Sequence, residues 1–131
     1  SNHRKREIMN ATLTKLERKA LNVALSGLSE WHAALRRQLP HLRVVSRQYT
    51  GVGFFANFEC IDCLPVTEPA PSDPSERVPV AWAAHPDIDD GGDGVISFHV
   101  FLKDGVIEFL EGVSTSAWPE TEDLITFATE R

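Results

Sequence analysis

The stretch that decides the fold runs from Gly94 to Pro119 and reads GVISFHVFLKDGVIEFLEGVSTSAWP. Two apolar runs flank the pair Asp104–Gly105, and both of these residue types tolerate the positive φ angles of a type I′ turn. A short turn of this kind between two runs rich in Val, Ile and Phe is typical of an antiparallel hairpin. The stretch therefore predicts two paired β-strands joined by a two-residue turn.

Counting outward from that turn gives an expected register, because successive side chains of a strand alternate between the two faces. Six side chains then share one face, and they are Phe98, Val100, Leu102, Ile107, Phe109 and Glu111. Five of the six are large and apolar, so this face should be buried. Glu111 would lie opposite Phe98 at the margin of a hydrophobic layer, where a charge needs a partner. We expect it to reach water or to pair with an arginine such as Arg47, with a catalytic acid as the alternative.

Two helices are predicted ahead of the first strand. Thr14–Glu17 has the residue types of a capping box, apolar residues follow at helical spacing, and Gly27 is the expected stop. Ser29 can cap a second helix, which Pro40 ends because proline disfavours the helical conformation of the residue before it. The sequence therefore predicts a helical pair at the start of the folded region.

Further strands are predicted from runs rich in Val, Phe and Tyr, at Leu42–Tyr49 and Val52–Cys60. Thr50–Gly51 between them is interpreted as a turn, with a bulge in one bent strand as the alternative. Leu64–Val78 contains four prolines and is expected to be an exposed loop, since proline cannot join a hydrogen-bonded ladder. Val78–His85 is a third candidate strand, which Pro79 places at a sheet edge.

Helices followed by several strands indicate an α+β fold, with the N-terminal helical pair packed on an antiparallel β-sheet. The chain has 131 residues, a length that suits one domain. We assign residues 11–131 to that domain and residues 1–10 to a flexible N-terminal segment. The apolar residues of the acidic tail should dock on the domain: Leu124, Ile125 and Phe127.

The charge balance excludes some classes of partner. Thirteen Lys and Arg residues against nineteen Asp and Glu residues give a net charge of −6, which argues against nucleic acid and anionic membranes. The basic cluster His3–Arg6 is interpreted as a solvated chain end. No apolar run reaches the roughly 20 residues of a membrane span, and two cysteines do not make a secreted disulfide framework. We therefore expect a cytoplasmic protein with no membrane association.

Two short motifs could carry chemistry. Cys60–Cys63 has the spacing of a redox or zinc pair, but zinc requires four ligands and a redox pair usually precedes a helix. Structural thiols are the preferred interpretation, with metal and redox roles as alternatives. Asp87–Gly94 is acidic and glycine-rich, yet it lacks the ligand spacing of a calcium loop. No catalytic triad or phosphate loop is recognisable, so we predict no metal site, no cofactor and no catalytic residue.

A possible binding surface remains, because aromatic, cationic and amide side chains gather in the predicted strands. Such residues dominate protein interfaces, and the candidates are Arg47, Tyr49, Phe54, Asn57, Glu111 and Trp118. We predict a non-enzymatic protein-interaction module, such as a small regulatory or immunity-like protein. The alternative is a small enzyme or ligand-binding protein with a pocket near Arg47, Tyr49, Glu111 and Trp118. A homodimer formed through the Val78–His85 edge is compatible with both.

Several segments of the chain, taken together, resemble a family of small uncharacterised bacterial proteins. They are Leu13–Gly27, Leu35–Leu39, Val44–Phe55 and Asp104–Pro119, and they cover nearly the whole domain. Ala56 departs from the threonine that members tend to carry, and the cysteine pair is peculiar to this chain. The resemblance implies a bacterial cytoplasmic source and a single domain, and it implies no activity.

Overall fold

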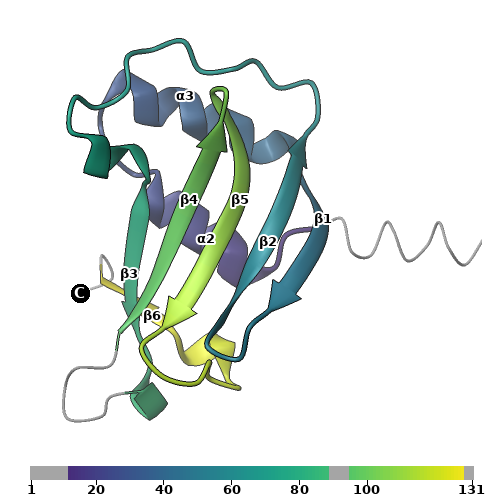
Figure 1. The fold of residues 1–131 in the computed structure, drawn as a ribbon, viewed down its shortest axis with the longest axis vertical. Coiled ribbons are helices and arrows are strands. Elements are labelled where there is room, and N and C mark those ends of the chain that lie inside the picture. The colour runs from purple at the N-terminus through teal and green to yellow at the C-terminus, as the bar shows by residue number, and fades with distance from the viewer. Residues whose placement is uncertain (1–11, 89–94, 129–131) are drawn as a thin grey trace, which may run out of the picture.

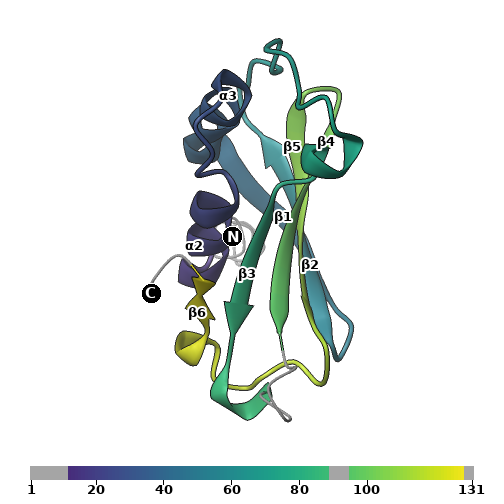
Figure 2. The same ribbon diagram turned by 90° about the vertical axis from the view of Figure 1, so that its left-hand side faces the viewer.

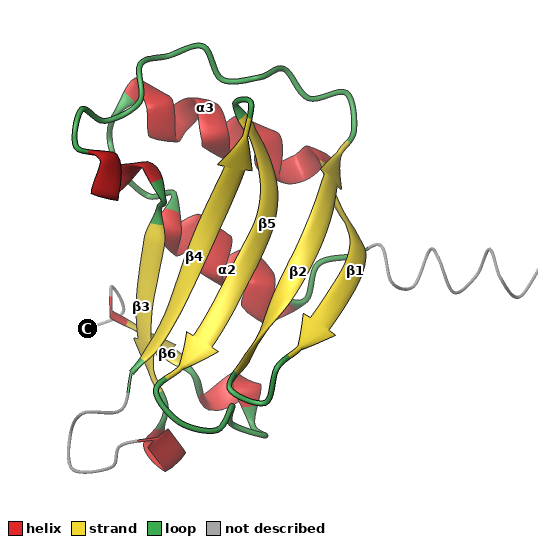
Figure 3. Ribbon diagram, in the orientation of Figure 1, coloured by secondary structure: helices red, strands yellow, loops and turns green. Residues whose placement is uncertain are grey.

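The computed structural model describes residues 12–88 and 95–128. Two helices, α2 (Lys15–Ala24) and α3 (Glu30–Gln38), lie against one face of a six-stranded antiparallel sheet (Figures 1, 2 and 3), as the α+β prediction requires. The strands are β1 (Leu42–Tyr49), β2 (Gly53–Cys60), β3 (Val80–Ala84), β4 (Ile96–Lys103), β5 (Val106–Ser114) and β6 (Thr126–Phe127). Their order across the sheet is β1-β2-β5-β4-β3-β6.

Both helices begin at the predicted caps. The Thr14 hydroxyl accepts a hydrogen bond from the Glu17 amide at 3.1 Å, and the Glu17 carboxylate accepts one from the Thr14 amide at 2.8 Å. Ser29 caps α3 by accepting from the amide of its third residue, His32. Helix α2 ends at Ala24, three residues before Gly27. A short 3₁₀ turn that contains the predicted proline follows α3.

The central hairpin has the predicted turn. Asp104 and Gly105 both have positive φ, 53° and 78°, and the first strand pairs form as expected next to the turn. Beyond Leu102 the predicted register is wrong, because Glu108 is an extra residue that forms a β-bulge. One inserted residue swaps the faces of all side chains that follow it. Phe98 therefore pairs with Gly112, and Glu111 points away from the core.

The bulge has a physical reason in the packing of the buried face. A Cβ at position 112 would lie 2.6 Å from the Phe54 ring and 3.0 Å from the Phe98 ring, so only glycine fits between these rings. The shifted register places this glycine and Leu110 inward. It also keeps the Glu111 carboxylate out of the hydrophobic layer, where an unpartnered charge would cost several kcal/mol.

Strands β1 and β2 form a second antiparallel pair. The Thr50 amide donates to the Gly53 carbonyl at 3.0 Å, so the segment between them is a turn and not a bulge in one bent strand. A separate β-bulge lies inside β1 at Val45, between Val44 and Ser46. This bulge turns Arg47, two residues further along the strand, toward the helices.

The core lies between the helices and the sheet, and its largest fully buried apolar side chains are Leu21, Leu25, Leu35, Ile96, Phe98, Val100, Ile107, Leu110 and Phe127. The tail docks as predicted through Ile125 and Phe127, whereas Leu124 stays exposed. Strand β6 pairs with β3 at Ala83 and Ala84. The prediction that the start of Val78–His85 lies at a sheet edge agrees with the structure, because among the described residues β6 pairs with the end of β3 and not with its start.

The proline-rich segment from 64 to 78 forms no strand, in agreement with the prediction, and it runs past the tip of the β4–β5 hairpin (Figure 1). The predictions for residues 1–10, for the basic cluster and for most of the acidic loop at 87–94 concern positions outside the described residues. Within the described part of the chain, no helix is long and apolar enough to cross a membrane.

Candidate functional site

The six predicted binding residues divide between the two faces of the sheet. Four of them lie on the face that carries the helices, or at its end: Arg47, Tyr49, Phe54 and Trp118. Asn57 and Glu111 lie on the opposite face, which no helix covers in the described parts of the chain (Figure 2). The four residues of the predicted pocket therefore do not converge, since Glu111 is separated from the other three by the sheet itself.

Arg47 is occupied by a carboxylate that the sequence interpretation missed. Its Nε and Nη2 lie 2.8 and 2.9 Å from the two carboxylate oxygens of Glu17, and Nη2 also donates to the Thr12 carbonyl. Glu17 is only 2% exposed. The hydrogen bond to Glu17 is the main cause that raises the pKa of Arg47. The expected pairing of Arg47 with Glu111 is therefore wrong.

The position of Glu17 could have been read from the helix pattern. It precedes Ala20, Leu21 and Ala24 at spacings of three, four and seven, so it lies on the buried stripe of α2. The same side chain completes the capping box with Thr14. A carboxylate on a buried stripe requires a cation from a neighbouring element, and Arg47 on β1 supplies it.

The aromatic candidates on the helix side belong mostly to the core. Phe54 is 3% exposed, and the Trp118 ring lies 5.4 Å from it in an edge-on contact. The Trp118 indole N–H donates to the Glu122 carboxylate at 2.8 Å. Tyr49 is 71% exposed at the end of an edge strand, with its ring centroid 6.3 Å from that of Phe54. Phe54 and Trp118 therefore close the end of the core, and only Tyr49 is freely accessible.

The uncovered face carries an aromatic patch, which we define as Phe55, Phe101 and Phe109. The Phe109 ring stacks on that of Phe101 with 4.5 Å between centroids, and it meets Phe55 edge-on at 6.0 Å. These three residues come from β2, β4 and β5, and all are partly exposed. The sequence prediction placed Phe109 on the buried face, because it did not include the bulge at Glu108.

Glu111 lies beside this aromatic patch. It pairs across the sheet with Phe55 on β2 and with His99 on β4. Within the described residues, its carboxylate has no hydrogen bond and no ion pair. A partly exposed carboxylate flanked by aromatic rings is suited to a cation that approaches from outside the molecule.

Two other pairs of polar groups on this face are hydrogen-bonded to each other. The Nε2 of His99 lies 2.9 Å from the Ser97 hydroxyl, and the Asn57 amide donates to the Ser46 hydroxyl at 3.0 Å. Serine, histidine and a carboxylate are the residue types of a hydrolytic triad. However, Ser97 is only 8% exposed, so its hydroxyl lacks the open approach that a nucleophile needs. The face offers a surface rather than an enclosed site.

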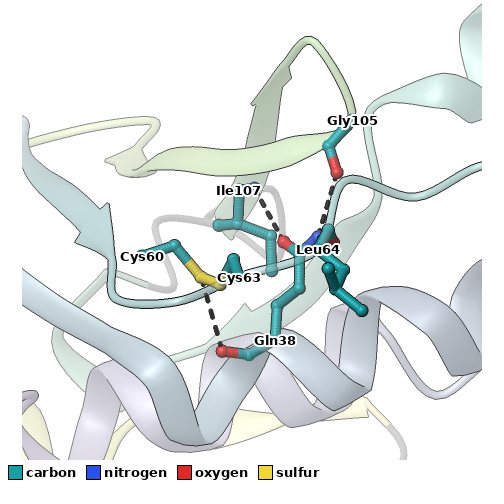
Figure 4. The surroundings of a disulfide bond; sticks show 6 residues. All are labelled: Gln38, Cys60, Cys63, Leu64, Gly105 and Ile107. Carbon is teal, nitrogen blue, oxygen red and sulfur yellow. Dashed lines mark hydrogen bonds between the residues drawn. A yellow bond between two sulfur atoms is a disulfide. The ribbon is translucent and has the colours of Figure 1, made fainter.

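The two cysteines form a disulfide bond at the end of β2 (Figure 4). The preferred prediction of free structural thiols is therefore wrong. A cleft of about 330 Å³ lies beside this bond, between α3 and the segment that follows Cys63. Within residues 12–88 and 95–128, no group of three or more metal-ligating side chains is arranged to hold a metal ion.

Comparison with models of protein families, with curated proteins and with solved structures gives no match for this chain. The resemblance to small uncharacterised bacterial proteins therefore stays a prediction.

Proposed function

We propose that this protein is a non-enzymatic interaction module that binds a basic partner protein through the uncovered face of its sheet. The observation that carries the proposal is the aromatic patch with Glu111 at its side. Aromatic rings give contact area at low conformational cost, and they are enriched where interface residues contribute most to binding energy. A small regulatory or immunity-like protein of the bacterial cytoplasm would use such a surface.

Charge supports a cationic partner. The chain carries a net charge of −6, so it attracts basic proteins and accelerates their encounter at low salt. Glu111 offers a localised acceptor within the patch, next to Phe55. An arginine is the best-matched side chain, because its guanidinium can bind the carboxylate and stack on a ring.

A second copy of the chain suits this face less well. Two copies that meet face to face around a two-fold axis would bring like carboxylates toward each other, since such an interface uses the same patch twice. Like charges across an interface are unfavourable. A homodimer through this face is therefore an alternative outcome of the experiment below.

The test is capture from a lysate with the tagged protein as bait, followed by quantification of the captured partner. We expect one stoichiometric basic partner, lost with Glu111→Lys and with Phe109→Ala. Glu120→Lys is the matched control, because it makes the same charge change at an exposed loop position outside the patch. All three variants should remain folded by circular dichroism.

Two results would contradict the proposal. If both patch variants still captured the partner, the binding surface would lie elsewhere on the molecule. If no stoichiometric partner were captured at all, the proposal of a stable complex would be wrong. Sedimentation analysis of the purified protein separates the homodimer alternative. A dimer that Phe109→Ala dissociates would assign the patch to self-association.

A further inference from the structure

We infer that Cys60–Cys63 is an exchangeable disulfide, opened at Cys63 by a small thiol that enters the adjacent cleft. This inference does not depend on the proposed interaction surface, which lies on the other side of the sheet. It concerns a pair of residues that has no part in the proposed function. The cleft, the surroundings of each sulfur and the anchoring of the loop support it separately.

The two sulfurs have different surroundings. Cys60 is the last residue of β2 and packs against the core, and its Sγ lies 3.8 Å from the Gln38 carbonyl oxygen (Figure 4). Cys63 lines the cleft of about 330 Å³, whereas Cys60 does not. A thiolate that approached Cys60 would meet an electron-rich carbonyl oxygen. Approach through the cleft leads instead to Cys63.

The reaction is a thiol–disulfide exchange. The incoming thiolate attacks the Sγ of Cys63, a new sulfur–sulfur bond forms, and the Cys60–Cys63 bond breaks. The electron pair of the broken bond stays on Cys60, which takes up a proton from solvent. The resulting Cys60 thiol can then donate to the Gln38 carbonyl, which already lies within reach. The incoming thiol is oxidised and the protein disulfide is reduced.

Charges of both signs line the cleft. Arg37 and His41 contribute nitrogen groups, whereas Asp62 and Glu68 contribute carboxylates, and Glu68 bridges Arg37 at 3.4 Å. The Arg37 side chain is 65% exposed, so its attraction for an anion is screened by salt. The lining therefore gives no preference for an anionic thiol, and glutathione serves below as the probe.

The loop is held in place without the disulfide. The Ile61 amide donates to the His41 carbonyl at 2.9 Å, and the Val66 amide donates to the Gly105 carbonyl at 2.9 Å. The Gln38 side chain adds hydrogen bonds to the carbonyls of Leu64 and Gly105, at 3.1 and 2.9 Å. Exchange can therefore proceed in the folded protein, because opening the bond releases no large segment.

The experiment treats the native protein with reduced glutathione, quenches with acid and locates the adduct by mass spectrometry. We expect a glutathione adduct on Cys63, with the circular dichroism spectrum unchanged. With oxidised glutathione as the reagent, Cys60→Ser should be modified at Cys63 at least about tenfold faster than Cys63→Ser is modified at Cys60, since only Cys63 lines the cleft. An adduct mainly on Cys60, or exchange only after unfolding, would overturn the inference.

Discussion

The two faces of the sheet place the same residue types in opposite environments. On the helix side, Glu17 is 2% exposed and its carboxylate accepts hydrogen bonds from Arg47 and from the Thr14 amide. On the uncovered side, Glu111 lies among aromatic rings with no hydrogen bond or ion pair from the described residues. The helix side satisfies its carboxylate internally. On the open side, the Glu111 carboxylate is available to a partner. Glu17 is therefore a structural charge, whereas Glu111 is a candidate binding charge.

Phenylalanine shows the same contrast. Phe98 is fully buried, with ring neighbours from the helix-side core and the tail. Phe109 has ring neighbours too, but it remains partly exposed. Only complete burial converts a ring into a large contribution to stability, so the two faces should respond very differently to the same substitution.

The largest expected effect is that of Phe98→Ala, which should lower the free energy of unfolding by about 4 kcal/mol. The substitution removes a buried ring and leaves a cavity between the sheet and the tail. Urea denaturation followed by circular dichroism measures the loss. A change below about 1 kcal/mol would show that the helix-side core does not have the tight packing described.

Arg47→Ala should cost about 3 kcal/mol, because it leaves the buried Glu17 carboxylate without its cation. The double variant Arg47→Ala with Glu17→Gln should recover part of that loss, since no charge then remains buried. Denaturation of the wild type, the two single variants and the double variant gives the coupling energy. Additive losses would contradict the assignment of this pair as one buried unit.

Phe109→Ala on the open face should cost about 1 kcal/mol, which corresponds to a partly exposed ring and its stacking on Phe101. The matched comparison is Phe98→Ala, the same change on the covered face. If both variants lost the same stability, the open face would be part of a core, and its availability to a partner would be excluded.

Glu111→Gln should change the free energy of unfolding by less than about 0.5 kcal/mol, because the carboxylate is partly exposed and no described residue pairs with it. Glu17→Gln is the matched control and should be clearly destabilising, since it removes one member of the buried ion pair. A large loss with Glu111→Gln would indicate a hidden structural partner.

The smallest effect concerns His32 on α3. Burial, followed by the charge of Arg36, lowers the pKa of this imidazole below its usual value of 6.5. The unfolded chain then binds the proton more readily, so stability falls as the pH drops through about 6.5 toward the lower folded-state pKa. His32→Gln should reduce this loss slightly between pH 7.5 and pH 5.5, as thermal melts would show. If His32→Gln and the wild type had the same dependence of stability on pH, the lowered pKa of His32 would be contradicted.

Much of the fold follows from local patterns. The capping box at Thr14, the cap at Ser29 and the turn at Asp104–Gly105 each depend on residues within a few positions of one another, and each was predicted correctly. The strands Leu42–Tyr49 and Gly53–Cys60 likewise matched their apolar runs to within one residue. Local hydrogen-bond and dihedral preferences decide such features, so the sequence displays them directly.

The candidate site was predicted less well, because side-chain direction depends on register. One extra residue at Glu108 moved Phe109 and Glu111 to the open face, and one at Val45 moved Arg47 to the helix side. Nothing local marks either bulge. Each is favoured by what the rest of the fold brings near, such as the tight fit of Gly112 between two rings.

The sequence by itself determined the α+β class, the caps, the turns and the acidic balance, since these depend on composition and on neighbours along the chain. Only the tertiary structure decided which carboxylate is buried, which rings remain accessible, and that Cys60 and Cys63 are joined beside a cleft. The physical reason is that a side chain's environment is set by contacts between segments that lie far apart in the chain. A shift of one residue in strand pairing moves the side chains that follow it from the solvent face to the core face, or the reverse.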